Sequence, residues 1–313
     1  MQVHHSTDIA ADARGATVAL GNFDGVHRGH QALIAEARRA APEAPLGVVS
    51  FTPHPRRYFQ PDAPPFLLTL PREKARRLER LGVDHLYEIT FDAALSSMSA
   101  AAFVEDVLVQ ELGISHIVVG ADFRFGKARG GDAALLRQMG EQLGFGVTIH
   151  SLILGAGGEY GSSAIRVMLG EGRCLDAAEQ LGCWHTISGP VILGDQRGRD
   201  LGYPTANLAF EGQLIPRYGI YACDVTVHDG PHAGSYQGVA SIGERPTFGM
   251  NAPNFEVHLF DFQGDIYGAE ISAGLVAWLR GEERFDSVDA LIAQMDADSE
   301  AARERLESAR VPG

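Results

Sequence analysis

The first half of the chain alternates short apolar runs with longer stretches in which apolar residues recur at helical spacing. The apolar runs have the length of buried β-strands and cover residues 17–20, 46–51, 85–89, 116–119 and 147–152. The helical spacing covers residues 30–40, 71–81, 100–112 and 133–143. Pro71 suits a first helical position, and Ser99 and Asp132 suit N-caps. Alternating strands and helices predict an α/β Rossmann-like domain, with a parallel sheet and helices on both faces.

The pattern changes near Cys183, where short β-rich runs replace the alternation. They cover residues 187–193, 219–227, 236–242, 255–260 and 269–279, and turn signals such as Asp229-Gly230 separate them. This spacing is typical of a small antiparallel β-barrel. A C-terminal helix is expected from Asp286, with Leu291, Ile292 and Met295 on one face. The predicted domains are therefore residues 1–184 and residues 185–313.

Composition narrows the class of protein. A chain of 313 residues is long enough for two hydrophobic cores, and its net charge of −14 argues against a nucleic-acid partner. The chain contains no apolar run that could cross a membrane and no secretory signal pattern, and its three cysteines are an odd number without metal-site spacing. We expect a cytoplasmic protein with reduced thiols and no membrane partner, which is a monomer or a weak homo-oligomer.

The first candidate site is the glycine-rich stretch of residues 21–30, which follows a strand and opens a helix. A helix N-terminus favours phosphate, and glycines let the backbone approach it. His27 and His30 form the pattern His-x-Gly-His and could donate hydrogen bonds to a triphosphate. The candidate phosphate contacts are Gly21, Asn22, Phe23, Asp24 and Gly25. The alternative is a glycine turn with two surface histidines.

Two later segments should reach the same edge of the sheet. Residues 120–126 follow the fourth strand, but they are not a phosphate-binding P-loop, because the glycine spacing is wrong and Ala128 replaces the required hydroxyl. Ser162, Ser163 and Arg166 follow the fifth strand and start another helix, where they could clamp a phosphate. Helix capping by Ser162 or Ser163 is the alternative.

The second candidate site is the polar loop of residues 194–207. The chain has two lysines, Lys74 and Lys127, and both lie in the first half, so a phosphate site here must use backbone amides, arginine or a metal ion. Thr205 and Asn207 could place oxygens near Mg²⁺. The candidate nucleotide contacts are Gly194, Gly198, Arg199, Gly202 and Pro204. The alternative is a long connection between strands.

Glu256 is a single carboxylate in an otherwise apolar strand, next to Phe255 and Val257. A carboxylate in such a position could act as a base toward a hydroxyl group. The strand alternation equally allows a glutamate that faces solvent.

Four segments in this order resemble the adenylyltransferase module of prokaryotic bifunctional riboflavin kinase/FAD synthetases. They are residues 21–30 with the His-x-Gly-His signature, the turn at residues 51–55, the segment 122–126 and the segment 162–166. Residues 198–207 look like the riboflavin kinase signature of the same family, and residues 219–222, 242–249, 255–262 and 279–285 fit its later segments. The resemblance covers nearly all of residues 15–310.

The resemblance implies a nucleotidyltransferase domain that makes FAD from FMN and ATP, followed by a kinase barrel that makes FMN from riboflavin and ATP. In the kinase, Thr205 and Asn207 would bind Mg-ATP and Glu256 would be the base. In the first domain, His27, His30 and Arg166 would stabilise charge. The flavin contacts implied are Phe51, Pro53, His54, Pro55, Asp122, Phe123, Arg124, Phe125 and Arg280.

The sequence departs from the family pattern at a few positions. Gly161 replaces the first serine of the Ser-Ser-Thr/Ser-x-Ile-Arg segment, Ser241 stands where asparagine is usual, and Glu244 stands where a small or apolar residue is common. The first change, with Ala164, motivates an alternative in which the chain is a riboflavin kinase with a weakened or inactive adenylyltransferase. A different adenylyl acceptor and a non-enzymatic flavin-responsive role are further alternatives.

Overall fold

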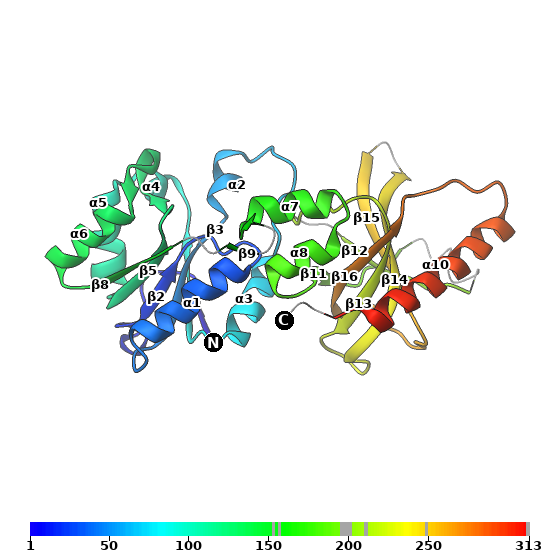
Figure 1. Ribbon diagram of the computed structural model, residues 1–313, viewed down its shortest axis with the longest axis horizontal. Helices are drawn as coiled ribbons and strands as arrows, with labels where there is room; N and C mark the ends of the chain where they lie inside the picture. Colours follow the sequence, from blue (N-terminus) through cyan, green and yellow to red (C-terminus); the bar gives the residue numbers. More distant parts are fainter. Residues whose placement is uncertain (152–153, 156–157, 195–201, 210–211, 248–249, 311–313) are drawn as a thin grey trace. The chain divides into compact units, whose positions relative to one another are not determined.

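The computed structural model describes residues 1–313 except 152–153, 156–157, 195–201, 210–211, 248–249 and 311–313 (Figure 1). The chain forms two compact units. The first contains Met1–Ala63 and Pro71–Tyr160, and the second contains Pro64–Leu70 and Gly161–Gly313. The predicted domain limits at residues 184 and 185 rest on the change of strand pattern in the sequence. They remain a prediction.

The first unit contains a six-stranded parallel sheet with strand order β1-β4-β3-β2-β5-β8 (Figure 1). Its strands are β1 (Gln2–His4), β2 (Thr17–Leu20), β3 (Leu46–Thr52), β4 (His85–Thr90), β5 (His116–Gly120) and β8 (Gly146–His150). Short pairs β6 (Arg124–Phe125) with β7 (Gly131–Asp132) and β9 (Leu154–Gly155) with β10 (Gly158–Glu159) follow β5 and β8. The helices are α1 (Arg28–Ala40), α2 (Pro55–Phe59), α3 (Pro71–Arg80), α4 (Ala93–Ser97), α5 (Ala100–Ala102) and α6 (Ala133–Leu143).

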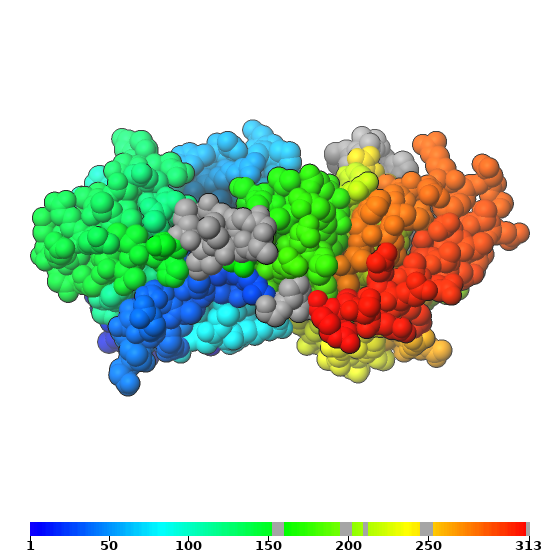
Figure 2. All heavy atoms as spheres, viewed as in Figure 1, coloured from blue at the N-terminus to red at the C-terminus, as the bar shows by residue number. Residues whose placement is uncertain are grey.

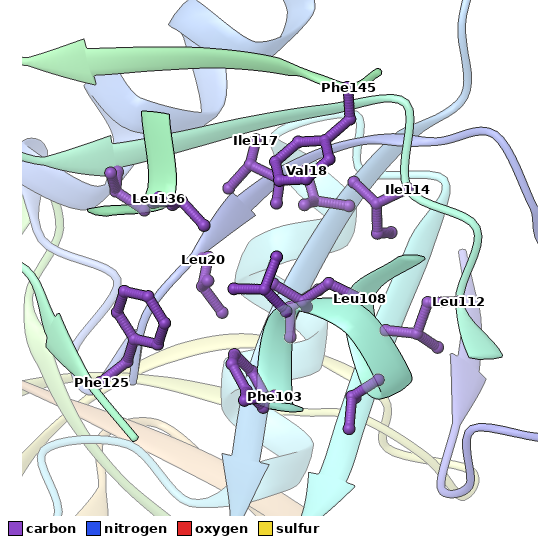
Figure 3. Packing of buried hydrophobic residues seen from close by; sticks show 14 of the residues in the cluster. Val18, Leu20, Phe103, Leu108, Leu112, Ile114, Ile117, Phe125, Leu136 and Phe145 are labelled. Atoms are coloured by element: carbon purple, nitrogen blue, oxygen red, sulfur yellow. The ribbon is translucent and has the colours of Figure 1, made fainter. Parts of the chain in front are cut away.

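The two faces of this sheet bury separate hydrophobic cores. Successive side chains of a strand point to opposite faces. Val18 and Leu20 of β2 therefore pack against Phe103 and Leu136 on one face (Figure 3). Between them, Ala19 of β2 belongs to the other core, which helices α1 and α3 supply with Ile34, Ala37 and Leu78. Helices on both faces of a parallel sheet confirm the predicted Rossmann-like class.

The helix ends of the first unit follow the sequence signals. Ser99 accepts a hydrogen bond from the amide of Ala102 at 3.1 Å, and Asp132 accepts one from the amide of Leu135 at 2.9 Å. Helix α3 begins at Pro71, as predicted. The helix expected over residues 100–112 differs, because α5 continues as a π-helix over Phe103–Glu111. Strand β1 is too short to show an alternating pattern and was not predicted.

The second unit contains a six-stranded antiparallel sheet with strand order β11-β16-β13-β14-β15-β12. Its strands are β11 (His185–Pro190), β12 (Ala206–Ala209), β13 (Gly219–Val227), β14 (Gly234–Thr247), β15 (Met250–Leu259) and β16 (Glu270–Arg280). A bridge between Ile192 and Asn207, with the Ile192 amide donating to the Asn207 carbonyl at 2.9 Å, connects β12 to the segment that directly follows β11. The curled sheet surrounds a core that includes Tyr221, Ile242 and Phe255. This arrangement confirms the predicted barrel.

Among its described residues, the second unit also contains three α-helices. They are α7 (Ser162–Gly170), α8 (Cys174–Leu181) and α10 (Val288–Ser308). Helix α10 packs on β13, β14 and β16 and lies on the surface of the unit, where Figure 2 colours it red. Its buried face is formed by Asp298, Ala302 and Leu306 rather than by the residues near its start. No helix among the described residues has both the length and the apolar character that crossing a bilayer requires.

One expectation is wrong in this half. The glycine-rich pattern predicts that Asn207 lies in a loop between strands, but Asn207 lies within β12, which pairs with β15. The four residues of β12 follow a stretch rich in glycine and proline, which hides the strand from a pattern of alternation.

Gly238 of β14 lies so close to strand β15 that a side chain has no room, because a Cβ there would overlap the carbonyl oxygen of His258. At Gly234 of the same strand, the nearest atom to a Cβ would be 3.7 Å away. We predict that Gly238→Ala lowers the free energy of unfolding of the second unit by about 1–3 kcal/mol. Gly234→Ala should change it by less than about 0.5 kcal/mol. Denaturant unfolding followed by tryptophan fluorescence measures both, because Trp184 and Trp278 belong to this unit, and equal stabilities would contradict the prediction.

Candidate functional site

The loop of residues 21–25 follows β2 at the carboxyl edge of the parallel sheet. Strand β2 pairs with β3 on one side and β5 on the other, so the connections that leave the sheet here diverge in opposite directions. Open α/β sheets bind ligands at such a point. The loop leads into α1, whose N-cap residue His27 makes no side-chain capping bond. The position is therefore suited to a phosphate group at a helix N-terminus.

The backbone of this loop has an unusual shape. Phe23 and Val26 have φ angles of 52° and 44°, although neither is a glycine, and their side chains are buried. A non-glycine residue in this region costs on the order of 1–3 kcal/mol, which the surrounding packing must offset. Both side chains belong to the core that α1 and α3 form with the sheet. The core therefore fixes the shape of the loop and leaves Asn22 exposed.

The two histidines of the signature lie against each other. The rings of His27 and His30 stack with centroids 3.7 Å apart, and Phe23 lies 4.8 Å from the ring of His30. Burial, and then the charges of His27 and Lys74, hold the pKa of His30 well below its ordinary value of 6.5. Among the described residues, no group hydrogen-bonds to His30 Nδ1. At neutral pH His30 is thus an uncharged ring with one N–H group to donate.

Helix α3 places two buried cations against the loop, and sequence reasoning missed both. Lys74 Nζ lies 2.9 Å from Glu88 Oε1 and donates to Ser50 Oγ at 3.1 Å. Arg77 donates from Nη1 to the carbonyl oxygen of Gly25 at 3.2 Å. The buried face of α3 consists of Glu73, Lys74, Arg77 and Leu78. Three charges on one helical face were the signal that could have revealed them.

The turn after β3 carries the first group of expected flavin contacts. Phe51 is half-buried and makes an edge contact with Phe91, with ring centroids 5.9 Å apart. After Pro53, His54 caps α2 by accepting a hydrogen bond from the amide of Arg56 at 3.1 Å, and Pro55 is the first residue of that helix. The roles of His54 and Pro55 in the turn are thus structural, and their contact with flavin stays a prediction.

The segment after β5 divides between surface and core. Asp122 and Arg124 are exposed, and Arg124 forms an ion pair with Asp132 at 3.0 Å. Phe123 stacks on Phe125 with centroids 5.6 Å apart. Phe125 itself belongs to the hydrophobic core (Figure 3). Phe123 therefore presents more of this aromatic pair to a ligand than Phe125 does.

The serine segment begins helix α7 of the second unit, whereas His27 and His30 belong to the first unit. The N-cap residue is Gly161, so neither Ser162 nor Ser163 takes the capping position. Arg166 is half-buried, and its Nε donates to the carbonyl oxygen of Phe66 at 2.8 Å. This bond fixes the guanidinium group next to the backbone of Phe66.

The second candidate site is assembled by the pairing of β12 with β15. Asn207 is directly opposite Glu256 in the register, so both side chains lie on the same face. Thr205 Oγ1 donates to Glu256 Oε2 at 3.2 Å, and Asn254 Nδ2 donates to Glu256 Oε1 at 2.7 Å. The neighbours Phe255 and Val257 point into the barrel core. Glu256 is therefore a half-buried carboxylate held by two donors, and sequence reasoning missed Asn254 as one of them.

The departure at residue 241 falls in this cluster. Strand β15 pairs with β14 on the side opposite to β12, and there Ser241 of β14 is the register partner of Glu256. Gly194 lies close to the same cluster, because a Cβ there would overlap the side-chain amide of Asn207 unless that amide moved. Gly198 and Arg199 lie outside the described residues.

Helix α10 binds two residues near the Glu256 cluster, Tyr203 just before β12 and Arg280 at the end of β16. The hydroxyl of Tyr203 donates to Asp296, and the carbonyl oxygen of Pro204 accepts a hydrogen bond from His258 Nδ1 at 2.9 Å. Gly202, with φ of 83°, begins this short segment. At the other end, Arg280 forms a two-pronged ion pair with the buried carboxylate of Asp298, at 2.8 and 2.7 Å. Arg280 was expected to contact flavin, and this ion pair fixes where its side chain lies.

The donor set suits a magnesium ion that arrives with ATP. The described residues contain no group of three or more histidine, cysteine or carboxylate side chains that could hold a metal unaided. Mg²⁺ prefers oxygen ligands and takes several of them from water and substrate phosphates. A magnesium ion therefore needs few protein ligands. Thr205 and Asn207 offer two neutral oxygens next to the Glu256 carboxylate.

Comparisons with known proteins match each half of the chain to a family model. Residues 9–164 match the family model described as FAD synthetase, and residues 181–306 match the one described as riboflavin kinase. The bifunctional riboflavin kinase/FMN adenylyltransferases of Escherichia coli (strain K12) and Pseudomonas fluorescens are 39% and 40% identical to this chain. These alignments cover 94% and 95% of this chain and 94% of each relative.

A solved structure is also similar over nearly the full length. It is described as a macrolide-efflux protein from Streptococcus pneumoniae, and it matches with a TM-score of 0.84 and 32% sequence identity. The match covers 96% of this chain and 98% of that chain. Two matched domain models and full-length relatives leave one conclusion: the chain belongs to the bifunctional riboflavin kinase/FMN adenylyltransferase family.

Proposed function

We propose that the chain catalyses two consecutive ATP-dependent steps. The second unit transfers the γ-phosphate of ATP to the 5′-hydroxyl of riboflavin, giving FMN and ADP. The FMN phosphate then attacks the α-phosphate of a second ATP, giving FAD and pyrophosphate. The observation that carries this proposal is the match of both domain models in one chain, each over a region that contains its own polar cluster.

Glu256 is proposed as the base of the kinase step. Its carboxylate would accept the proton of the riboflavin hydroxyl as that oxygen attacks the γ-phosphorus. The two hydrogen bonds from Thr205 and Asn254 orient the carboxylate before substrate arrives. Phosphoryl transfer otherwise depends on alignment and on neutralised charge. Gly194, Gly198, Arg199, Gly202 and Pro204 are proposed to hold the nucleotide.

Thr205 and Asn207 are proposed to hold the Mg²⁺ of Mg-ATP. Bound there, the ion would neutralise phosphate charge. Thr205 donates its proton to Glu256, so the lone pairs of its hydroxyl oxygen remain available for a cation. Asn207 is held in place by its strand and by the close backbone of Gly194.

His27 and His30 are proposed to stabilise the triphosphate of ATP in the adenylyl transfer, together with Arg166. The loop of residues 21–25 supplies backbone amides at a helix N-terminus. The stacked imidazoles would donate N–H groups toward the oxygens on which charge develops as pyrophosphate leaves. The FMN phosphate is itself the nucleophile, so the chain forms no covalent intermediate.

The same chemistry defines the ligands of the protein. ATP, riboflavin and FMN are proposed as its small-molecule substrates, and FAD is proposed as its final product. Flavin contacts of the first step would include Arg280, and those of the second would include Phe51 and Phe123.

A riboflavin kinase with an inactive adenylyltransferase is the second candidate, because Gly161 removes one hydroxyl from the serine segment. Both domain models match the chain, and its relatives are bifunctional. Ser162, Ser163 and Arg166 remain in their segment. These findings favour the bifunctional enzyme.

We predict that substitutions in the two clusters separate the two steps. His30→Ala should lower FAD formation from FMN by about 100-fold or more, because a donor to the developing charge is lost, and it should leave FMN formation intact. Glu256→Gln should block FMN formation, but FAD should still form from supplied FMN. Chromatography of the flavins after incubation with ATP and Mg²⁺ measures both steps.

Two other substitutions serve as matched controls. His116 starts β5 at the opposite edge of the sheet, and Glu270 starts β16 of the barrel. His116→Ala and Glu270→Gln should leave both steps near the wild-type rates. If His30→Ala and Glu256→Gln damaged both steps equally, the division of labour would be wrong.

ATP should change the titration of His30. The pKa of His30 is depressed in the free protein, so its ring is neutral until the pH falls well below 6.5. A triphosphate beside the ring favours the charged form, so bound ATP should raise this pKa. Carbon-13 NMR of the imidazole, with and without a non-hydrolysable ATP analogue, measures the shift. If the pKa of His30 stayed the same or fell when the analogue bound, the triphosphate would not lie next to this histidine.

Restoring the missing hydroxyl tests the departure in the serine segment. A Cβ at Gly161 would meet no atom within 4 Å, and φ is −162°, so serine fits without strain. We predict that Gly161→Ser raises stability by a few tenths of a kcal/mol through helix capping and changes the rate of FAD formation by less than about threefold. A wild-type protein that forms no FAD, with activity restored in the variant, would support the kinase-only candidate instead.

A further inference from the structure

Lys74 is buried at an unusual place for a lysine. The chain has two lysines, and the side chain of this one is 9% exposed. A buried lysine is rare unless it is paired, and even the pair with Glu88 is costly to desolvate. Replacing such a pair with apolar residues of similar volume is often neutral or stabilising. Stability alone therefore gives little reason for this ion pair.

The contacts of Lys74 lead from the ion pair to the candidate ATP loop. Its ammonium group donates to Ser50 Oγ at 3.1 Å while it lies 2.9 Å from Glu88 Oε1. The Ser50 hydroxyl donates onward to the carbonyl oxygen of Asn22 at 3.1 Å. Ser50 is fully buried on β3, so no solvent competes for this relay.

Arg77 makes a second contact with the same loop from the next turn of α3. Its Nη1 donates to the carbonyl oxygen of Gly25 at 3.2 Å, and its Nε is held by Glu73 at 3.1 Å. Asn22 and Gly25 are therefore both fixed by cations of one helix, and they flank the strained residue Phe23. Lys74 also lies close enough to His30 to disfavour its protonation, as does His27 of the loop.

We propose that Lys74 is a positioning residue of the adenylyltransferase. Through Ser50 it fixes the carbonyl of Asn22, and together with Arg77 it holds residues 21–25 in the shape that offers their amides and the two histidines to the triphosphate of ATP. The inference rests on the proposed function of this loop. It assigns a role in the reaction to a helix that follows the loop by some 50 residues in the sequence.

The test separates positioning from simple stabilisation. Ser50→Ala removes the relay and leaves the ion pair, whereas the double variant Lys74→Met/Glu88→Leu removes both charges, so that no buried charge is left unpaired. Ser115→Ala is the matched control. Its hydroxyl also donates to backbone carbonyls, at 2.7 and 3.2 Å, but at the amino end of β5, away from the loop.

Positioning predicts that both variants fold, by circular dichroism, and lose about 10- to 100-fold in kcat/KM for ATP during FAD formation. The KM for FMN, the riboflavin kinase rate of the same protein and the Ser115→Ala control should stay within about twofold. The amide NMR signals of residues 21–25 should shift in both variants and not in the control.

Either of two results would overturn the proposal. One is an unchanged kcat/KM for ATP in Ser50→Ala or in the double variant. The other is a set of loop amide signals that match the wild type. The second readout needs no turnover, so it decides the proposal even if the wild-type protein makes no FAD, a result that would by itself refute the proposed adenylyl transfer.

Discussion

The short strand β12 is the constraint on which the second unit depends. It pairs with β15 on one side, and its bridge to Ile192 connects it toward β11 on the other, so the curled sheet closes around its core. The same register sets Asn207 opposite Glu256. A slip of one residue would turn Asn207 toward the core and Leu208 toward the site, because side chains alternate across a strand. The register of β12 against β15 therefore determines both the closure of the barrel and the geometry of the proposed kinase site.

In the first unit, the surrounding structure must hold the glycine-containing loop of residues 21–25 in one conformation. Phe23 and Val26 have strained backbone angles, and the core beneath them must offset that cost. Arg77 of α3 binds the carbonyl of Gly25 directly, and Lys74 of α3 binds Ser50, whose hydroxyl donates to the carbonyl of Asn22. The loop is therefore held by apolar packing of Phe23 and Val26 and by hydrogen bonds that originate from charged residues of α3. This support explains how a segment with two glycines can present a fixed set of donors.

The sequence predicted the elements well where periodicity is strong. The strand over Thr17–Leu20, the helix over Ala133–Leu143 and the strand over Gly219–Val227 match the expected bounds, because each is a regular run with clear end signals. Strand β12 was missed, since four residues after a glycine-rich stretch show no alternation. Local signals likewise could not reveal the pairing of Lys74 with Glu88 or the hold of Asn254 on Glu256, because tertiary contacts decide them.

We propose that one chain carries two ATP sites that act in sequence on a flavin. Isotope tracing from riboflavin tests it most directly, with ATP labelled at the γ-phosphorus in one experiment and at the α-phosphorus in another. FMN should carry the γ-label alone. FAD should carry one γ-label on its flavin phosphate and one α-label on its adenylate. Flavin products that acquire γ-label but never α-label would contradict a second ATP site that acts on FMN.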